Sequence, residues 1–168
     1  MKKINFLFLI LLSLILFFLE IVNLDRLEIF FLEIKFSYTL VLTILVSLNC
    51  RNIYQVLIFC LVNGLLIDIF NNFTSFYFIN LIIMSLIVNN FSKKVTFSNL
   101  YLFIIISFST FFVEIINATL IGFFYYGFEN NLVSYQIFKE NILKYVIGNN
   151  IIGYFFNLFI KKIFIKQA

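Results

Sequence analysis

The sequence predicts an all-α integral membrane protein, with residues 1–168 forming one domain of about six transmembrane helices. The first observation is compositional: 63% of the residues are hydrophobic, 12% are charged, and the mean hydropathy is +1.08. Soluble domains are roughly 45–50% apolar and about 25% charged. A soluble fold of this size has too little interior to bury so many Leu, Ile and Phe side chains. The second observation is that the apolar residues fall into separate runs with short polar segments between them.

The apolar runs cover residues 4–22, 36–48, 53–70, 76–88, 100–125 and 145–160. A helix needs about 20 mainly apolar residues to cross a hydrocarbon core that is about 30 Å thick. The first run follows two lysines, as in a signal peptide, but no small-residue cleavage site follows it, so we expect an uncleaved helix. The second run is short, so we expect it to extend to Lys35, whose side chain would snorkel. Segments 23–35 and 127–144 are polar and are predicted to be loops.

The charged residues predict the orientation of these spans. With six spans and an N-terminus in the cytoplasm, the cytoplasmic segments contain no acidic residue. Their basic residues are Lys2, Lys3, Arg51, Lys93, Lys94, Lys161, Lys162 and Lys166. The outer loops and helix ends carry fewer basic than acidic residues. Because basic residues are enriched on the cytoplasmic side of membrane proteins, both termini are predicted to be cytoplasmic.

A glycine and an acid lie on one face of the third run. Asp68 is near the end of the run and Gly64 is four residues earlier. Glycine lets another helix approach closely, and a carboxylate costs less near the membrane interface than at its centre. One interpretation is that Asn63, Gly64 and Asp68 mark a contact with another helix or with a partner. The other is that Asp68 is a solvated helix end and Gly64 only packs.

Glu114 lies deeper in the fifth run, on a polar face with Thr110 and Asn117. Because no basic residue lies at that depth, we expect Glu114 to be protonated or hydrogen-bonded to a polar stripe on another helix. The sixth run offers such a stripe in Asn150, Gly153 and Asn157, with Tyr154 beside them. Interhelical hydrogen bonding, an ion or proton pathway and a small-ligand pocket are all open interpretations of these residues.

The residue inventory lacks the groups that catalytic and metal sites need. The chain has no His, so imidazole cannot activate a Ser or Cys. Cys50 and Cys60 have no metal-ligand spacing, and we interpret both as reduced packing residues. The net charge of +4 sits at the ends of apolar runs, which membrane orientation explains better than nucleic-acid binding. We predict a non-enzymatic protein with no metal, cofactor or nucleic acid.

The segment from Val56 to Phe70 contains Gly64-Leu65-Leu66-Ile67-Asp68. It resembles the third-helix signature of the rod shape-determining protein MreD family. Chain length, the number of spans, short loops and a basic C-terminus are similar to that family over nearly the whole chain. After Asp68 the turn has Asn71 and Asn72 where the family often has Gly.

This resemblance implies a non-catalytic scaffold of the cell-wall elongation complex in the bacterial inner membrane, with Gly64 and Asp68 as motif residues. The implied direct partner is an MreC-like membrane protein. The implied assembly also contains RodA, a penicillin-binding transpeptidase and, indirectly, MreB filaments. The alternative is the substrate-binding membrane subunit of an energy-coupling-factor vitamin transporter, which has a similar length and fold. A vitamin pocket should show convergent polar and aromatic residues, whereas this chain has no Trp and few polar residues in its spans. A lipid-modifying enzyme is a third class.

Overall fold

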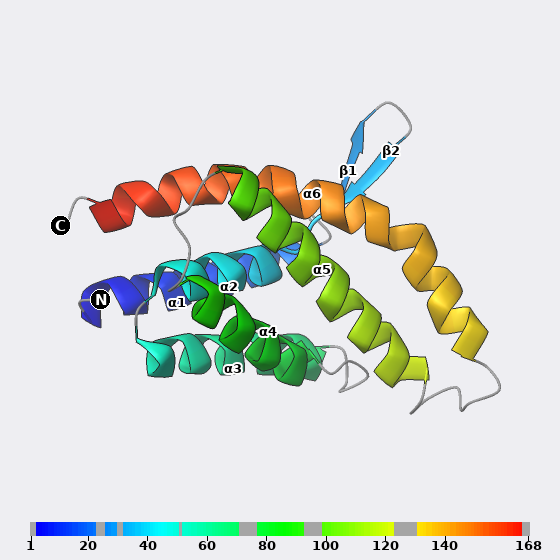
Figure 1. The fold of residues 1–168 in the computed structure, drawn as a ribbon, viewed down its shortest axis with the longest axis horizontal. Helices are drawn as coiled ribbons and strands as arrows, with labels where there is room; N and C mark the ends of the chain where they lie inside the picture. The colour runs from blue at the N-terminus through cyan, green and yellow to red at the C-terminus, as the bar shows by residue number, and fades with distance from the viewer. Residues whose placement is uncertain are drawn as a thin grey trace.

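The computed structural model describes residues 3–22, 26–29, 32–50, 52–70, 77–92, 99–122 and 131–165. Within these ranges the chain forms six α-helices and one β-hairpin (Figure 1). The helices are α1 (Lys3–Ile21), α2 (Tyr38–Asn49), α3 (Ile53–Phe70), α4 (Tyr77–Ser92), α5 (Asn99–Ile121) and α6 (Asn131–Ile165). The strands β1 (Arg26–Ile29) and β2 (Leu32–Lys35) pair antiparallel, with Arg26 opposite Lys35.

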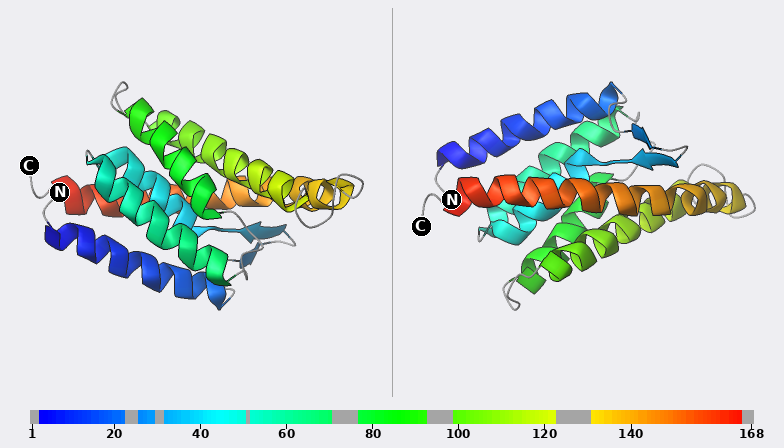
Figure 2. Two further views of the ribbon diagram at one scale, coloured as in Figure 1. Left: turned by 90° about the horizontal axis from the view of Figure 1, so that it is seen from below. Right: turned by 90° about the horizontal axis from the view of Figure 1, so that it is seen from above.

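Successive helices run in opposite directions, so their ends gather at two ends of the bundle (Figures 1 and 2). At the first, which we call the hairpin end, α1, α3 and α5 end and α2, α4 and α6 begin. At the second, which we call the terminal end, α1 begins and α6 ends. The first turn of α1 and the last turn of α6 therefore lie on the same side of the molecule.

Each predicted run contains a helix, but two predicted loops are wrong in part. Residues 26–29 and 32–35 form a hairpin, because polar and apolar residues alternate there with the period of a strand. Residues 131–144 belong to α6, whose 35 residues span roughly 50 Å at 1.5 Å per residue. This part of the helix contains no Gly or Pro, and Lys35 Nζ donates a hydrogen bond to Asn141 Oδ1 over 2.9 Å. Residues 127–130 lie outside the described part of the chain.

Helix α2 is the central element of the bundle. It contacts each of the other five described helices, and every residue from Thr39 to Leu48 is buried. Its surface is mostly apolar, and the hydroxyls of Thr43 and Ser47 donate to carbonyls one turn earlier in the same helix, so protein can surround it on all sides. Its 12 residues are fewer than the about 20 that a lipid-facing span needs, yet α2 runs from the hairpin end towards the terminal end inside the bundle, so the chain still changes ends there (Figures 1 and 2). The second apolar run is therefore a core helix enclosed by its neighbours.

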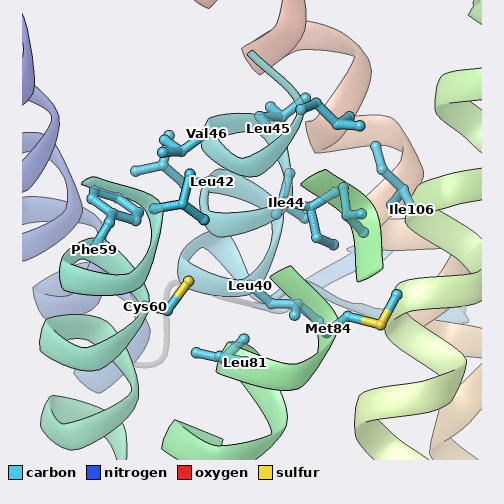
Figure 3. Packing of buried hydrophobic residues seen from close by; sticks show 14 of the residues in the cluster. Leu40, Leu42, Ile44, Leu45, Val46, Phe59, Cys60, Leu81, Met84 and Ile106 are labelled. Carbon is cyan, nitrogen blue, oxygen red and sulfur yellow. The ribbon is translucent and has the colours of Figure 1, made fainter. Parts of the chain in front are cut away.

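Side chains of α2 fill the space between three neighbouring helices (Figure 3). Labelled there are Leu40, Leu42, Ile44, Leu45 and Val46 of α2, Phe59 and Cys60 of α3, Leu81 and Met84 of α4, and Ile106 of α5. All of them are at most 2% exposed. Cys50 and Cys60 are buried and free, and Cys60 Sγ donates to Ser85 Oγ over 2.8 Å.

Two described helices are long and apolar enough to cross a membrane. They are α3 and the segment Asn99–Leu120 of α5. Only 39% of the first and 28% of the second is buried within the protein, whereas the core helix of a soluble protein is mostly buried. Large apolar side chains are also exposed on α1, α4 and α6; Leu7 is 71% exposed and Phe155 is 63% exposed.

Candidate functional site

Asp68 caps the helix that follows its own. Its side chain is 1% exposed. Oδ1 accepts a hydrogen bond from the backbone N–H of Tyr77 (2.9 Å), and Oδ2 accepts one from the N–H of Phe78 (3.0 Å). The first N–H groups of a helix have no partner inside it, and a carboxylate there also interacts favourably with the helix dipole. Asp68, near the end of α3, therefore fixes where α4 begins.

Gly64 brings the same two helices into close contact. A Cβ atom at this position would lie 2.3 Å from the Cα atom of Phe78. No side chain fits there unless the backbone of α4 moves. Asn63, the neighbouring residue, is fully buried; its Nδ2 donates to the carbonyl of Phe59 over 3.0 Å, and its Oδ1 has no partner among the described residues.

Glu114 of α5 joins this site through Tyr77. The Tyr77 hydroxyl donates a hydrogen bond to Glu114 Oε1 over 2.9 Å. Tyr77 therefore connects α3 to α5: its backbone N–H bonds Asp68 of α3, and its ring hydroxyl bonds Glu114 of α5. The expectation that Glu114 is hydrogen-bonded to another helix is confirmed, but the partner is Tyr77 of α4 and not the polar stripe that the sixth run offered. Tyr77 was not among the predicted site residues.

Two asparagines of α6 bond other residues of α5 and α2. Asn150 Nδ2 donates to Ser107 Oγ and to the carbonyl of Val146, both over 2.8 Å. Asn149, which was not among the predicted site residues, is fully buried. Its Nδ2 donates to Thr110 Oγ1 over 3.1 Å, and its Oδ1 accepts from the N–H of Ser37 over 2.7 Å.

The remaining predicted residue, Asn157, is 6% exposed on α6. Of the six predicted site residues, Gly64, Asp68 and Glu114 thus meet around the start of α4. Asn63 lies beside Gly64 on α3, while the hydrogen bonds of Asn150 go to Ser107 and Val146.

Glu20 repeats the role of Asp68 at the start of α2. Its Oε1 accepts a hydrogen bond from the N–H of Thr39 over 2.8 Å, and its Oε2 accepts one from the Thr39 hydroxyl. An acid in the last turn of a helix is unfavourable for its own helix dipole. Glu20 and Asp68 both occupy such positions, because each serves the N-terminus of the next helix. An acidic residue in the last turn of an apolar helix is therefore the sequence signal that could identify both residues.

A cavity of about 320 Å³ lies at the hairpin end between these two capped helix starts. It is lined by Phe17, Glu20, Ile21, Phe36, Ser37, Ile67, Phe70, Tyr77 and Tyr145. Five of these nine residues are aromatic. Within the described residues, no three His, Cys, Asp or Glu side chains come together in a group that could hold a metal ion.

The chain matches no protein-family model, no curated protein and no solved structure.

Proposed function

We propose that this chain is a non-catalytic scaffold of the bacterial cell-wall elongation complex, embedded in the cytoplasmic membrane. In this proposal the bundle is multi-pass and both termini are cytoplasmic. The low buried fractions of α3 and α5 support contact with lipid. Two observations support this orientation. The start of α1 and the end of α6 lie on the same side of the bundle (Figure 1), and basic residues are enriched in the segments predicted to be cytoplasmic.

The observation that carries the proposal is the structural use of the Gly64–Asp68 segment. This is the part of the sequence that resembles the MreD signature. Gly64 permits the close α3–α4 contact and Asp68 caps α4. Both residues shape the scaffold itself, which is consistent with a protein that acts by presenting fixed helix surfaces.

The proposed partner is an MreC-like membrane protein, in an assembly with RodA, a penicillin-binding transpeptidase and MreB filaments. Because Gly64 and Asp68 serve contacts inside the chain, the partner helix must use another surface. A groove of about 440 Å³ between α5 and α6 is suitable, since its lining is apolar except for Asn150 and the hydroxyl of Tyr154. Its walls include Phe103, Ile151 and Phe155, which are 55%, 43% and 63% exposed. Membrane helices associate through such close packing with occasional polar contacts.

Depletion of the protein, followed by microscopy of cell shape and wall labelling, tests the role. We expect loss of rod shape and dispersed wall synthesis. A photo-crosslinker at Ile151 should capture the MreC-like protein, while one at Leu11, exposed on α1, should not. Normal shape after depletion would contradict the role; capture at Leu11 alone would contradict only the assigned surface.

The alternative function, a substrate-binding subunit of an energy-coupling-factor vitamin transporter, is favoured by one feature. The cavity at the hairpin end combines aromatic rings with a carboxylate and hydroxyl groups. Co-purification separates the two functions: an associated pair of ATPase subunits supports transport, and an MreC-like protein supports the scaffold.

A further inference from the structure

A groove of about 320 Å³ lies between α4 and α5, in the halves of these two helices that are nearer the terminal end. It has a buried floor and an exposed rim. The floor residues are Met84, Val88 and Ile105, and the rim residues are Phe91, Ile104 and Phe108. The groove therefore opens to the outer surface of the bundle.

The surface of this groove is entirely apolar. Tyr101 and Ser109 also line it, but neither exposes a polar atom to it. Helices associate in membranes through small residues that allow close approach and through polar side chains that bond between helices. Here the walls are Ile, Val, Met, Phe and Tyr, and the one small residue, Ser109, is fully buried in the floor. A flexible hydrocarbon chain therefore fits this groove better than another helix does.

The groove has the depth of a single leaflet. Its deepest residue on α5 is Ser109, and the rise from the start of that helix at Asn99 is roughly 15 Å at 1.5 Å per residue. This distance is half of a hydrocarbon core that is about 30 Å thick. In the proposed membrane placement the groove therefore lies in the leaflet at the terminal end, where a phospholipid chain of that leaflet can enter it.

The charge of the terminal end favours an anionic headgroup. Lys93 and Lys94 directly follow α4 in the sequence, next to the rim residue Phe91. The segments predicted to be cytoplasmic, which belong to this end, carry basic residues and no acidic one. Lysines beside a membrane surface attract anionic lipids. A phospholipid whose chain lies in the groove has its headgroup at this basic end.

We propose that the α4–α5 groove binds one acyl chain of an anionic phospholipid, whose headgroup lies at the basic terminal end. The site is separate from the α5–α6 groove proposed for the partner helix, whose lining includes Asn150 and the hydroxyl of Tyr154. The inference rests on the membrane placement of the bundle and goes beyond the scaffold role.

The test uses the full chain reconstituted in phosphatidylcholine bilayers. The chain contains no Trp, so Phe108→Trp at the rim creates a single fluorescent reporter. Bromine atoms on lipid chains quench a nearby Trp. Quenching by brominated phosphatidylglycerol, compared with quenching by brominated phosphatidylcholine, gives the ratio of the two binding constants at the reporter. We expect phosphatidylglycerol to be preferred by about fivefold.

Two pairs of variants in the Phe108→Trp background locate the preference. Ile87→Phe enlarges a wall of the groove and should bring the ratio near one, whereas Ile83→Phe, at an exposed position of α4 that does not line the groove, should leave it unchanged. Replacing Lys93 and Lys94 by Gln should lower the ratio as well. Replacing Lys2 and Lys3 by Gln, the matched change in another terminal-end segment, should have no effect.

A ratio near one at Phe108→Trp, or a ratio that Ile87→Phe leaves unchanged, would overturn the proposal. An unchanged ratio without Lys93 and Lys94 would overturn the assignment of the headgroup. If Ile87→Phe does not fold, Ile104→Phe at the rim replaces it, and an unchanged ratio there has the same meaning.

The failure of the lipid site and the failure of the proposed function give different results. Normal cell shape after depletion would contradict the scaffold role and leave the lipid site standing. If neither brominated lipid quenches Phe108→Trp, α5 does not face lipid, and this result would contradict the membrane placement and the lipid site with it.

Discussion

The carboxylate of Asp68, near the end of α3, accepts a hydrogen bond from the backbone N–H of Tyr77, the first residue of α4. It also accepts the N–H of Phe78, against which Gly64 packs. Two residues one helical turn apart therefore hold the start of α4. The hydroxyl of the same Tyr77 reaches Glu114 on α5, so three helices are fixed relative to one another at the hairpin end.

Gly64→Ala should destabilise the bundle. The new Cβ would lie 2.3 Å from the backbone of Phe78, which cannot rotate away, and overpacking of this kind costs about 1–3 kcal/mol. Gly153→Ala is the matched control, since its Cβ would come too close only to Cδ1 at the end of the Ile106 side chain, and would meet Val41 at an ordinary 3.5 Å. It should change the free energy of unfolding by no more than about 1 kcal/mol. Denaturant unfolding of both variants in micelles measures the difference, and equal destabilisation would contradict the close α3–α4 contact.

Asp68→Ala should lower stability by about 0.5–2 kcal/mol, because the first N–H groups of α4 lose their acceptor. Asp68→Asn retains one acceptor oxygen and should lose less. Hydrogen exchange of the Tyr77 and Phe78 amides provides the direct readout, with faster exchange expected in the alanine variant. Unchanged exchange there would show that the carboxylate does not cap α4.

Tyr77→Phe should cost about 1–3 kcal/mol, because it leaves the Glu114 carboxyl oxygen without its donor. A double-mutant cycle of Tyr77→Phe and Glu114→Leu measures the interaction itself, with a coupling of about 1 kcal/mol expected. Tyr54→Phe is the control on an exposed tyrosine, 73% exposed, and should be neutral within about 0.5 kcal/mol. A coupling free energy near zero would show that Tyr77 and Glu114 do not link α4 to α5.

Phe108→Arg should impair membrane insertion. Phe108 is 54% exposed near the middle of α5, and an arginine at the centre of a span costs about 2.5–3.5 kcal/mol on insertion scales. Leu100→Arg, at an exposed position near the start of the same helix, should be tolerated because arginine can snorkel to the interface there. Membrane fractionation of the two variants compares them. Equal and normal amounts of both variants in the membrane would indicate that α5 does not face lipid.

The helices could be predicted from the sequence because each apolar run is long enough to show its pattern. The hairpin could not, because two four-residue strands of alternating polarity resemble a polar loop. The helical start of α6 was hidden by polar residues whose packing against β2 depends on the tertiary fold. α2 shows a further limit, because an apolar run predicts burial without saying whether lipid or protein surrounds the helix.

The site could be predicted only where the residue type was unusual for its position. Gly64, Asp68 and Glu114 stood out as a glycine and two acids within apolar runs. Tyr77 did not, since tyrosine is common at helix ends and its link to Glu114 joins residues 37 positions apart. Asn149 was overlooked beside Asn150, because the rotation of α6 decides which of the two faces Ser37.

Impermeant thiol labelling of single-cysteine variants in intact cells tests the central claim, a multi-pass bundle with cytoplasmic ends, most directly. Cys50 and Cys60, both buried, are first replaced by Ser and Ala. A cysteine at Glu140, exposed towards the hairpin end of α6, should react from outside. One at Gln167 should react only after permeabilisation. Labelling of Gln167→Cys in intact cells, with Glu140→Cys protected, would contradict the orientation and the scaffold role built on it.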